Sequence, residues 1–208
     1  MTQGYLHPLY AKSFSDIGTP LYLPKSKGWL IKRQIPGSRY FDAMCPYPLF
    51  FCQNWSWLLK DLDNLKNELV SVSLVIDPFA PLHFKKYPAY FDVFTAFKDH
   101  YLLDLKLPSR DTVSKNKRKT ALKALRDVSV DLQLAPNINN DEWVNLYSCL
   151  IERHQIKGIR TFSHESFSMQ TAIPNTHFFK VLFQDKIIGG NLFYIQNDVA
   201  YSHLSAFT

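Results

Sequence analysis

Three polar side chains near the carboxyl end of the chain, Tyr201, His203 and Ser205, lie two residues apart. Alternate residues of a β-strand point to the same face, so this spacing predicts one polar row. A histidine in such a row can act as a general base, and a tyrosine hydroxyl can stabilise an oxyanion. We therefore take His203 and Tyr201 as candidate catalytic residues, with Ser205 as a candidate substrate contact. The alternative is a strand with one polar face, in which His203 is only hydrogen-bonded.

The preceding stretch of the chain supplies two more candidates, Tyr194 and Asn191. Both fall on a neighbouring predicted strand, where they would complete the wall of the same substrate pocket. A tyrosine ring also serves as a half-buried packing residue, so both interpretations of Tyr194 stay open.

A basic block extends from Lys106 to Arg126 and contains a single acid, Asp111. Four of its cations recur at helical spacing: Lys115, Lys119, Lys123 and Arg126. Like charges one helical turn apart repel, so the pattern indicates a nearby anion such as a phosphate group, tRNA or a lipid-linked precursor. Arg118 and Lys119 are the candidate contacts. A solvated basic face explains the same pattern.

The elements that must position these residues follow from hydrophobic periodicity and turn signals. In the first half, we expect strands at 21–23, 28–35, 38–44, 70–76 and 100–107, a helix at 54–69 and a weak helix at 88–97. In the second half, we expect helices at 109–128, 140–154 and 163–174, with strands at 130–134, 177–183, 187–195 and 199–207. The last three strands form an antiparallel meander. The sequence therefore predicts an α/β (α+β) protein with a mixed, largely antiparallel sheet flanked by helices.

The composition is that of a globular protein, with 46% hydrophobic and 20% charged residues among 208. This length fits one large domain or two small ones. The net charge of +6 permits an anionic partner. The three cysteines lack metal-type spacing, which favours a reducing compartment and no metal site. No apolar run approaches the roughly 20 residues of a membrane span. We therefore expect a cytoplasmic protein without a transmembrane segment.

The stretch 186–208 (KIIGGNLFYIQNDVAYSHLSAFT) resembles the central hairpin and fourth strand of the GNAT acyltransferase fold. It is most similar to the Fem-like branch, which is related to the aminoacyltransferases of peptidoglycan bridges. Three upstream pieces are similar to motifs of that branch: 40–48 (YFDAMCPYP), 116–127 (NKRKTALKALRD) and 152–163 (ERHQIKGIRTFS). The general GNAT phosphate signature is absent, and the chain ends after the fourth strand. We therefore expect a fragment of a longer protein.

The resemblance implies an N-acyltransferase with two GNAT-like halves, the second incomplete. Residues 1–105 would form the acceptor side and residues 106–208 the start of the catalytic half. The donor would be acetyl-CoA, another acyl-CoA or aminoacyl-tRNA, and the acceptor a small-molecule or lipid-linked amine, such as a precursor of the cell envelope or of surface sugars. Asp42 and Tyr47 would be acceptor contacts. The alternatives are a non-catalytic anion- or RNA-binding module that uses the 109–128 helix, and a subunit completed by another chain, for example in a homodimer.

Overall fold

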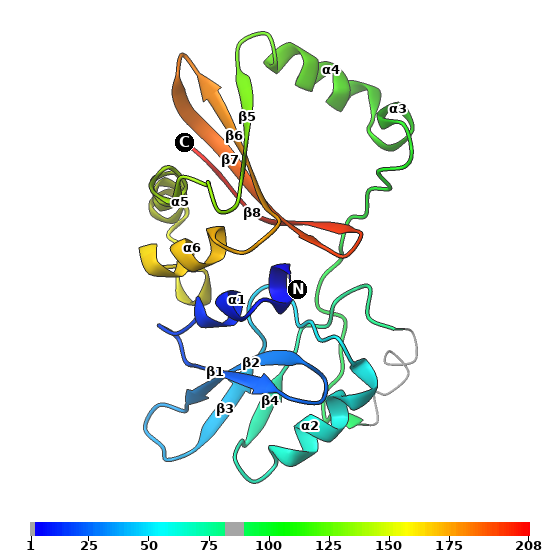
Figure 1. Ribbon diagram of the computed structural model, residues 1–208, viewed down its shortest axis with the longest axis vertical. Helices are drawn as coiled ribbons and strands as arrows, with labels where there is room; N and C mark the ends of the chain where they lie inside the picture. The colour runs from blue at the N-terminus through cyan, green and yellow to red at the C-terminus, as the bar shows by residue number, and fades with distance from the viewer. Residues whose placement is uncertain (1–2, 82–89) are drawn as a thin grey trace.

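The computed structural model of the chain describes residues 3–81 and 90–208. These residues form an α+β fold with two four-stranded sheets, ordered β1-β2-β3-β4 and β5-β6-β7-β8. The two sheets lie in opposite lobes of an elongated molecule, and the N-terminal segment with α1 lies between them (Figure 1). The predicted fold class is confirmed at this level.

The first lobe is built around a hairpin and a crossover helix. Its elements are η1 (Gly4–Leu6), α1 (Pro8–Lys12), β1 (Thr19–Leu23), β2 (Gly28–Gln34), β3 (Phe41–Met44), η2 (Trp55–Trp57), α2 (Leu58–Asn64) and β4 (Ser71–Ser73). β1, β2 and β3 are antiparallel, and β4 pairs with β3 in parallel after the crossover through α2. The strands predicted at 21–23, 28–35, 38–44 and 70–76 are present, the last two in shorter form, and the predicted 54–69 helix is a 3₁₀ turn followed by the shorter α2.

The second lobe places a helix pair between its first strand and a three-stranded meander. Its elements are α3 (Ser109–Thr112), α4 (Lys115–Ala124), β5 (Ser129–Leu134), α5 (Asn140–His154), η5 (Gly158–Arg160), α6 (His164–Thr171), β6 (Thr176–Phe183), β7 (Lys186–Gln196) and β8 (Val199–Phe207). All neighbouring strands here are antiparallel. The side chains of Asn139 and Ser163 accept from backbone N–H groups in the first turns of α5 and α6, which satisfies donors that a helix start leaves unpaired.

Three predicted elements in the stretch of sequence between β4 and β5 are wrong or only partly described. The predicted 109–128 helix breaks at Val113, which is extended, and Ser114 caps a separate α4. The predicted strand at 100–107 is irregular, because no described strand lies beside it to pair, and Tyr101 is fully exposed. The predicted helix at 88–97 falls partly outside the described residues, and residues 91–97 are not helical.

One hydrophobic core joins the two lobes. It takes aromatic rings from the N-terminal segment, such as Tyr5 and Tyr10, and packs them against Tyr194 of β7 and Phe51 of the first lobe. A second core lies between the first sheet and α2 and includes Leu30 and Leu58. The N-terminal segment therefore holds the lobes together through buried aromatic contacts.

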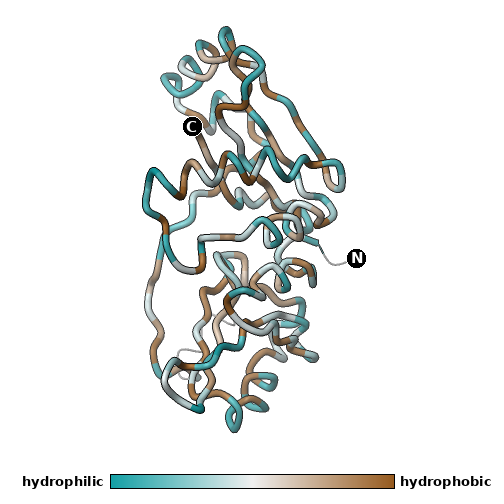
Figure 2. The backbone as a smooth tube through the Cα atoms, turned by 90° about the vertical axis from the view of Figure 1, so that its left-hand side faces the viewer, coloured by the Kyte–Doolittle hydropathy of each residue, from teal (hydrophilic) through white to brown (hydrophobic). Residues whose placement is uncertain are grey.

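The outer face of the second sheet is open. α5 and α6 lie against one face (Figure 1), whereas Val130, Leu132 and Leu134 of β5 are 45–50% exposed. The α3–α4 segment protrudes at the end of this lobe, and Figure 2 shows hydrophobic residues among hydrophilic ones there. Among the described residues, no helix is long and apolar enough to cross a membrane.

Candidate functional site

The strand β8 contains a β-bulge at His203. Leu192 pairs with Leu204, and the next residue of β7, Phe193, pairs with Ser202, so His203 is an extra residue in the ladder. A bulge leaves its extra residue unpaired and re-aims the neighbouring side chains, and such bulges occur often beside active sites. Because β8 also forms one edge of its sheet, the irregular backbone lies on a strand with one unpaired side.

The bulge corrects the prediction of a single polar row. Tyr201 and His203 point into the core between the lobes, as their ring contacts with Tyr5 show. Beyond the bulge the alternation changes phase, so Leu204 enters the core and Ser205 points to the outer face. Ser205 is therefore separated from the other two by the thickness of the sheet.

His203 is enclosed by a polar network inside the aromatic core. Its ring stacks on Tyr194 with centroids 4.6 Å apart. Its Nε2 lies 3.2 Å from the Oε1 of Gln170, and its Nδ1 lies 3.2 Å from the hydroxyl of Tyr5. The amide oxygen only accepts, so Nε2 carries the proton and Nδ1 accepts from Tyr5. Gln170 in turn donates to the Oγ of Ser13.

Burial controls the charge of this histidine. Only 7% of His203 is exposed, and desolvation lowers its pKa from 6.5 to about 3. The ring is therefore neutral near pH 7, and both of its nitrogens are already engaged. A general base needs a free nitrogen within reach of the substrate. The geometry thus gives His203 a positioning role for its neighbours, and its predicted catalytic role stays a prediction.

Tyr201 is the more accessible of the two predicted catalytic residues. Its ring packs edge-on against Phe51, and its hydroxyl donates to the Oδ1 of Asp77 at 3.4 Å. Burial is the largest cause that raises its pKa above 10, and the nearby Asp77 adds to the effect. The hydroxyl consequently keeps its proton at neutral pH and can act as a hydrogen-bond donor.

The other predicted contacts on the meander lie on two different faces. Tyr194 is fully buried, and its hydroxyl lies 3.5 Å from the carbonyl oxygen of Gln170. Asn191 accepts a hydrogen bond from Ser202 on the outer face, where it pairs with Ser205. Tyr194 therefore packs in the core, and Asn191 does not line the same pocket wall.

The predicted acceptor contacts of the first lobe are also separated. Asp42 forms a bidentate ion pair with Arg33, with distances of 3.0 Å to Nε and 2.8 Å to Nη2. The backbone carbonyl of Tyr47 accepts a hydrogen bond from the hydroxyl of Tyr10, and its half-buried ring packs against the core shared by the lobes. Tyr47 thus lies against the same core as Tyr201, whereas Asp42 is occupied by Arg33.

The predicted basic contacts lie apart from β8, at the end of the second lobe (Figure 1). Lys119 is exposed on α4. Arg118 is partly buried, and its Nη1 is a buried nitrogen without a hydrogen-bond partner among the described residues. An unpaired guanidinium nitrogen is costly, because it has lost water without gaining an acceptor. An anion at this helix would supply that acceptor.

A groove lies along β4. Its volume is about 780 Å³, and its walls come from residues 72–76, Pro78 and the segment 90–100. Asp77 lies between these wall residues and bonds to Tyr201. Lys98 and His100 also line the groove. Burial, and then the charge of Lys98, lower the pKa of His100. No pattern in the sequence indicated this groove, since the predicted 88–97 helix and 100–107 strand would have placed these side chains differently.

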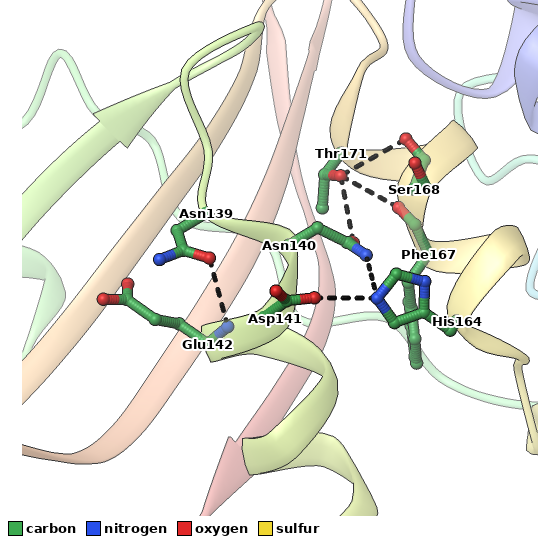
Figure 3. Close-up of polar contacts among 8 residues, drawn as sticks. All are labelled: Asn139, Asn140, Asp141, Glu142, His164, Phe167, Ser168 and Thr171. Carbon is green, nitrogen blue, oxygen red and sulfur yellow. Dashed lines mark hydrogen bonds and ion pairs between the residues drawn. The ribbon is translucent and has the colours of Figure 1, made fainter.

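A second polar cluster links the starts of α5 and α6 (Figure 3). The Nε2 of His164 lies 2.7 Å from the Oδ1 of Asp141 and 3.4 Å from the Nδ2 of Asn140. Thr171 donates to the Oδ1 of Asn140 and to the carbonyl oxygen of Phe167. His164 and Asp141 are both exposed, so this pair bridges the starts of two helices at the surface and has no enclosed space for a substrate.

Within residues 3–81 and 90–208, no group of three or more His, Cys, Asp or Glu side chains converges to form a metal site.

Two of the cysteines are buried thiols. Burial raises the pKa of Cys45 to about 11 and that of Cys52 to about 12, so both stay protonated and unreactive.

Comparison with protein-family models gives no match to this chain, and no curated protein matches it.

Proposed function

We propose that the chain is a GNAT-like N-acyltransferase, with its acceptor site in the first lobe and its acyl-transfer site at β8. The observation that carries this proposal is the bulge of β8 at His203, which interrupts an edge strand two residues after the half-buried Tyr201. The unpaired edge backbone offers N–H donors for a bound acyl group.

The order of elements supports the proposal. The second lobe runs from one strand through a helix pair to a three-stranded antiparallel meander. The first lobe has three antiparallel strands, a helix and a parallel strand. Both orders are compatible with the two GNAT-like halves that the resemblance implies. Fold similarity alone carries no activity, so the residues at the bulge must be tested.

Tyr201 would act as a hydrogen-bond donor to the leaving group. A neutral amine attacks the acyl carbonyl, the C–N bond forms and the C–S bond of the thioester breaks. The amine releases its proton to water, and the leaving thiolate accepts a hydrogen bond from the Tyr201 hydroxyl and takes its proton from solvent. The raised pKa keeps the hydroxyl protonated at neutral pH and makes it a weak acid, so its role is to donate a hydrogen bond. His203 positions the Tyr5 ring, which packs edge-on against Tyr201.

The groove along β4 is the proposed acceptor site. Its mixed wall, with apolar residues such as Val72 and Phe94 and the cation Lys98, suits an amine acceptor that also carries an anionic group. Asp77 connects the groove to Tyr201 through the hydrogen bond to its hydroxyl. The amine would thus meet the acyl group at that end of the groove.

The test is transfer and binding with Tyr201→Phe. The protein is incubated with acetyl-CoA, or with charged tRNA, and a panel of amines, and the acylated amine is measured by mass spectrometry. We expect product with the unaltered chain and about a 10²-fold lower rate with Tyr201→Phe, with donor affinity unchanged. Tyr40→Phe, in the exposed β2–β3 turn, is the control. Absence of both donor binding and product contradicts the proposal.

A second candidate function is anion or RNA binding by α4, and the unpaired Nη1 of Arg118 favours it. RNA affinity measured by fluorescence anisotropy between 50 and 200 mM salt should fall steeply, because phosphate contacts release counterions. Lys119→Glu should reduce both the affinity and the salt slope, whereas Lys60→Glu on α2 serves as the charge-matched control. A flat salt dependence contradicts this function.

A further inference from the structure

The β1–β2 hairpin carries an open corner made of two aromatic rings. Tyr22 and Trp29 are directly paired across the strands. Their ring centroids are 4.8 Å apart, and the ring planes are inclined by 48°. Tyr22 is 45% exposed, and Trp29 is only partly buried. Two large rings thus keep part of their faces in water, at a place where no described ring stacks on their open side.

The corner forms one wall of a cavity of about 380 Å³. Its other lining residues are Leu6, Pro8, Lys27 and Gln53. Ligand sites typically combine apolar and aromatic walls with a few polar groups that fix orientation, and volumes begin at about 300 Å³. Here the polar groups are the ammonium group of Lys27 and the side-chain amide of Gln53, and both residues are exposed. The cavity therefore has the composition of a small-molecule site and room for a single ring.

A buried carboxylate holds the hairpin turn rigid. Asp61 of α2 is only 2% exposed and accepts hydrogen bonds from the backbone N–H groups of Lys25 and Ser26 and from the hydroxyl of Ser26. The backbone N–H of Lys27 donates to the carbonyl of Leu23 at 2.8 Å. The turn that presents Lys27 is therefore preorganised, which lowers the entropy lost when a ligand binds.

A close approach of two backbones brings Gln53 to the corner. Gly28 forms an isolated bridge with Cys52. A Cβ atom at position 28 would lie 2.9 Å from both the Cβ of Cys52 and the carbonyl oxygen of Phe51. Only glycine permits this contact. The residue that follows Cys52 is consequently fixed beside Lys27 and Trp29.

We propose that this corner binds a single sugar ring that carries an acidic group, such as a uronic acid or a hexose phosphate. Two rings inclined by 48° cannot both lie flat against one planar base, whereas a puckered sugar ring presents C–H groups in two directions. Lys27 attracts an anionic substituent and repels a cationic ligand, and Gln53 can both donate to and accept from hydroxyl groups. The proposal does not depend on the transferase activity, because it concerns another face and only binding.

The test is a titration followed by saturation-transfer NMR and tryptophan fluorescence. The probes are glucuronate and glucose 6-phosphate, with glucose, inorganic phosphate and adenosine monophosphate as comparators. We expect saturable binding of the two acidic sugars, with glucose about tenfold weaker and phosphate without effect. No saturable binding of any sugar overturns the proposal. Tighter binding of the nucleotide than of every sugar overturns the sugar assignment.

Variants of the corner separate its parts. Tyr22→Ala should weaken both acidic sugars at least about tenfold, because a stacking face is lost. Lys27→Asn should lower their affinity to that of glucose, because the cation is removed. Asparagine is chosen because it tolerates the positive φ of 57° at this position. Tyr40→Ala, outside the lining of the cavity, is the control and should bind normally. If Tyr22→Ala binds as tightly as the unaltered chain, while its circular dichroism is native, the corner is not the site.

Discussion

Two aromatic groups in this protein both contain tyrosine rings and have opposite environments. The cluster around His203 buries Tyr5, Tyr10 and Tyr194 and satisfies its polar atoms internally. The corner of Tyr22 and Trp29 leaves its rings partly in water beside a cavity. The buried rings of the first group stabilise the fold, whereas the partly exposed rings of the second group are available to contact a ligand. Ring content alone therefore cannot distinguish a core from a binding site, whereas exposure and hydrogen bonding can.

The largest expected effect is on the cluster. Tyr194→Ala removes a fully buried ring that stacks on His203, and we expect a loss of about 3–5 kcal/mol in the free energy of unfolding, measured with urea. Tyr194→Phe keeps the ring and loses only a long hydrogen bond, so about 1 kcal/mol or less is expected. Equal losses in the two variants would contradict the role of the ring.

The pH dependence of stability tests the burial of His203. Because its folded pKa is about 3 and its ordinary value is 6.5, the unfolded chain takes up this proton first as the pH falls. The contribution of His203 is fully present above pH 6.5 and declines by up to about 1.4 kcal/mol per pH unit toward pH 3. His203→Gln should flatten the urea-measured profile between pH 6.5 and 4, whereas His154→Gln, at an exposed position, should not. A profile unchanged by His203→Gln would show that the ring is accessible to solvent.

The hairpin turn beside the corner is held by the buried carboxylate of Asp61. Asp61→Asn replaces a carboxylate that accepts three hydrogen bonds, and we expect a loss of about 1–3 kcal/mol together with weaker binding of acidic sugars. Asp63→Asn lies on the same helix, where the carboxylate pairs only with Lys66 on the surface, so its melting temperature should be unchanged. A stable Asp61→Asn protein with normal binding would mean that the turn needs no such support.

The smallest expected effect on stability is that of Tyr22→Ala. Its ring is exposed, so the free energy of unfolding should change by no more than about 0.5 kcal/mol, as at other surface positions. A loss of several kcal/mol in the free energy of unfolding would show that this ring stabilises the fold as the buried rings do, which contradicts the difference between the two groups.

The sequence predicted the parts that depend on local patterns. Ser163 was correctly expected at the start of a helix, and the meander at 176–207 follows from alternation and turn residues. The bulge was missed, because a period of two cannot reveal one inserted residue. The strand expected at 100–107 failed because alternation needs a neighbouring strand to pair with. The contact of Tyr5 with His203 joins residues 198 apart, and no short-range signal encodes it.

The extra residue of β8 gives this strand two halves of opposite parity. Up to His203 the odd-numbered side chains face the interior, and beyond it the even-numbered Leu204 and Ala206 do. Deleting His203 would join Ser202 to Leu204 in a regular ladder, in which Leu204 and Ala206 still face the interior and Ser205 still faces outward. The same deletion would remove the buried imidazole and its contacts with Tyr5 and Gln170. The extra length of the strand is thus tied to the placement of this one ring, and not to the direction of the residues that follow it.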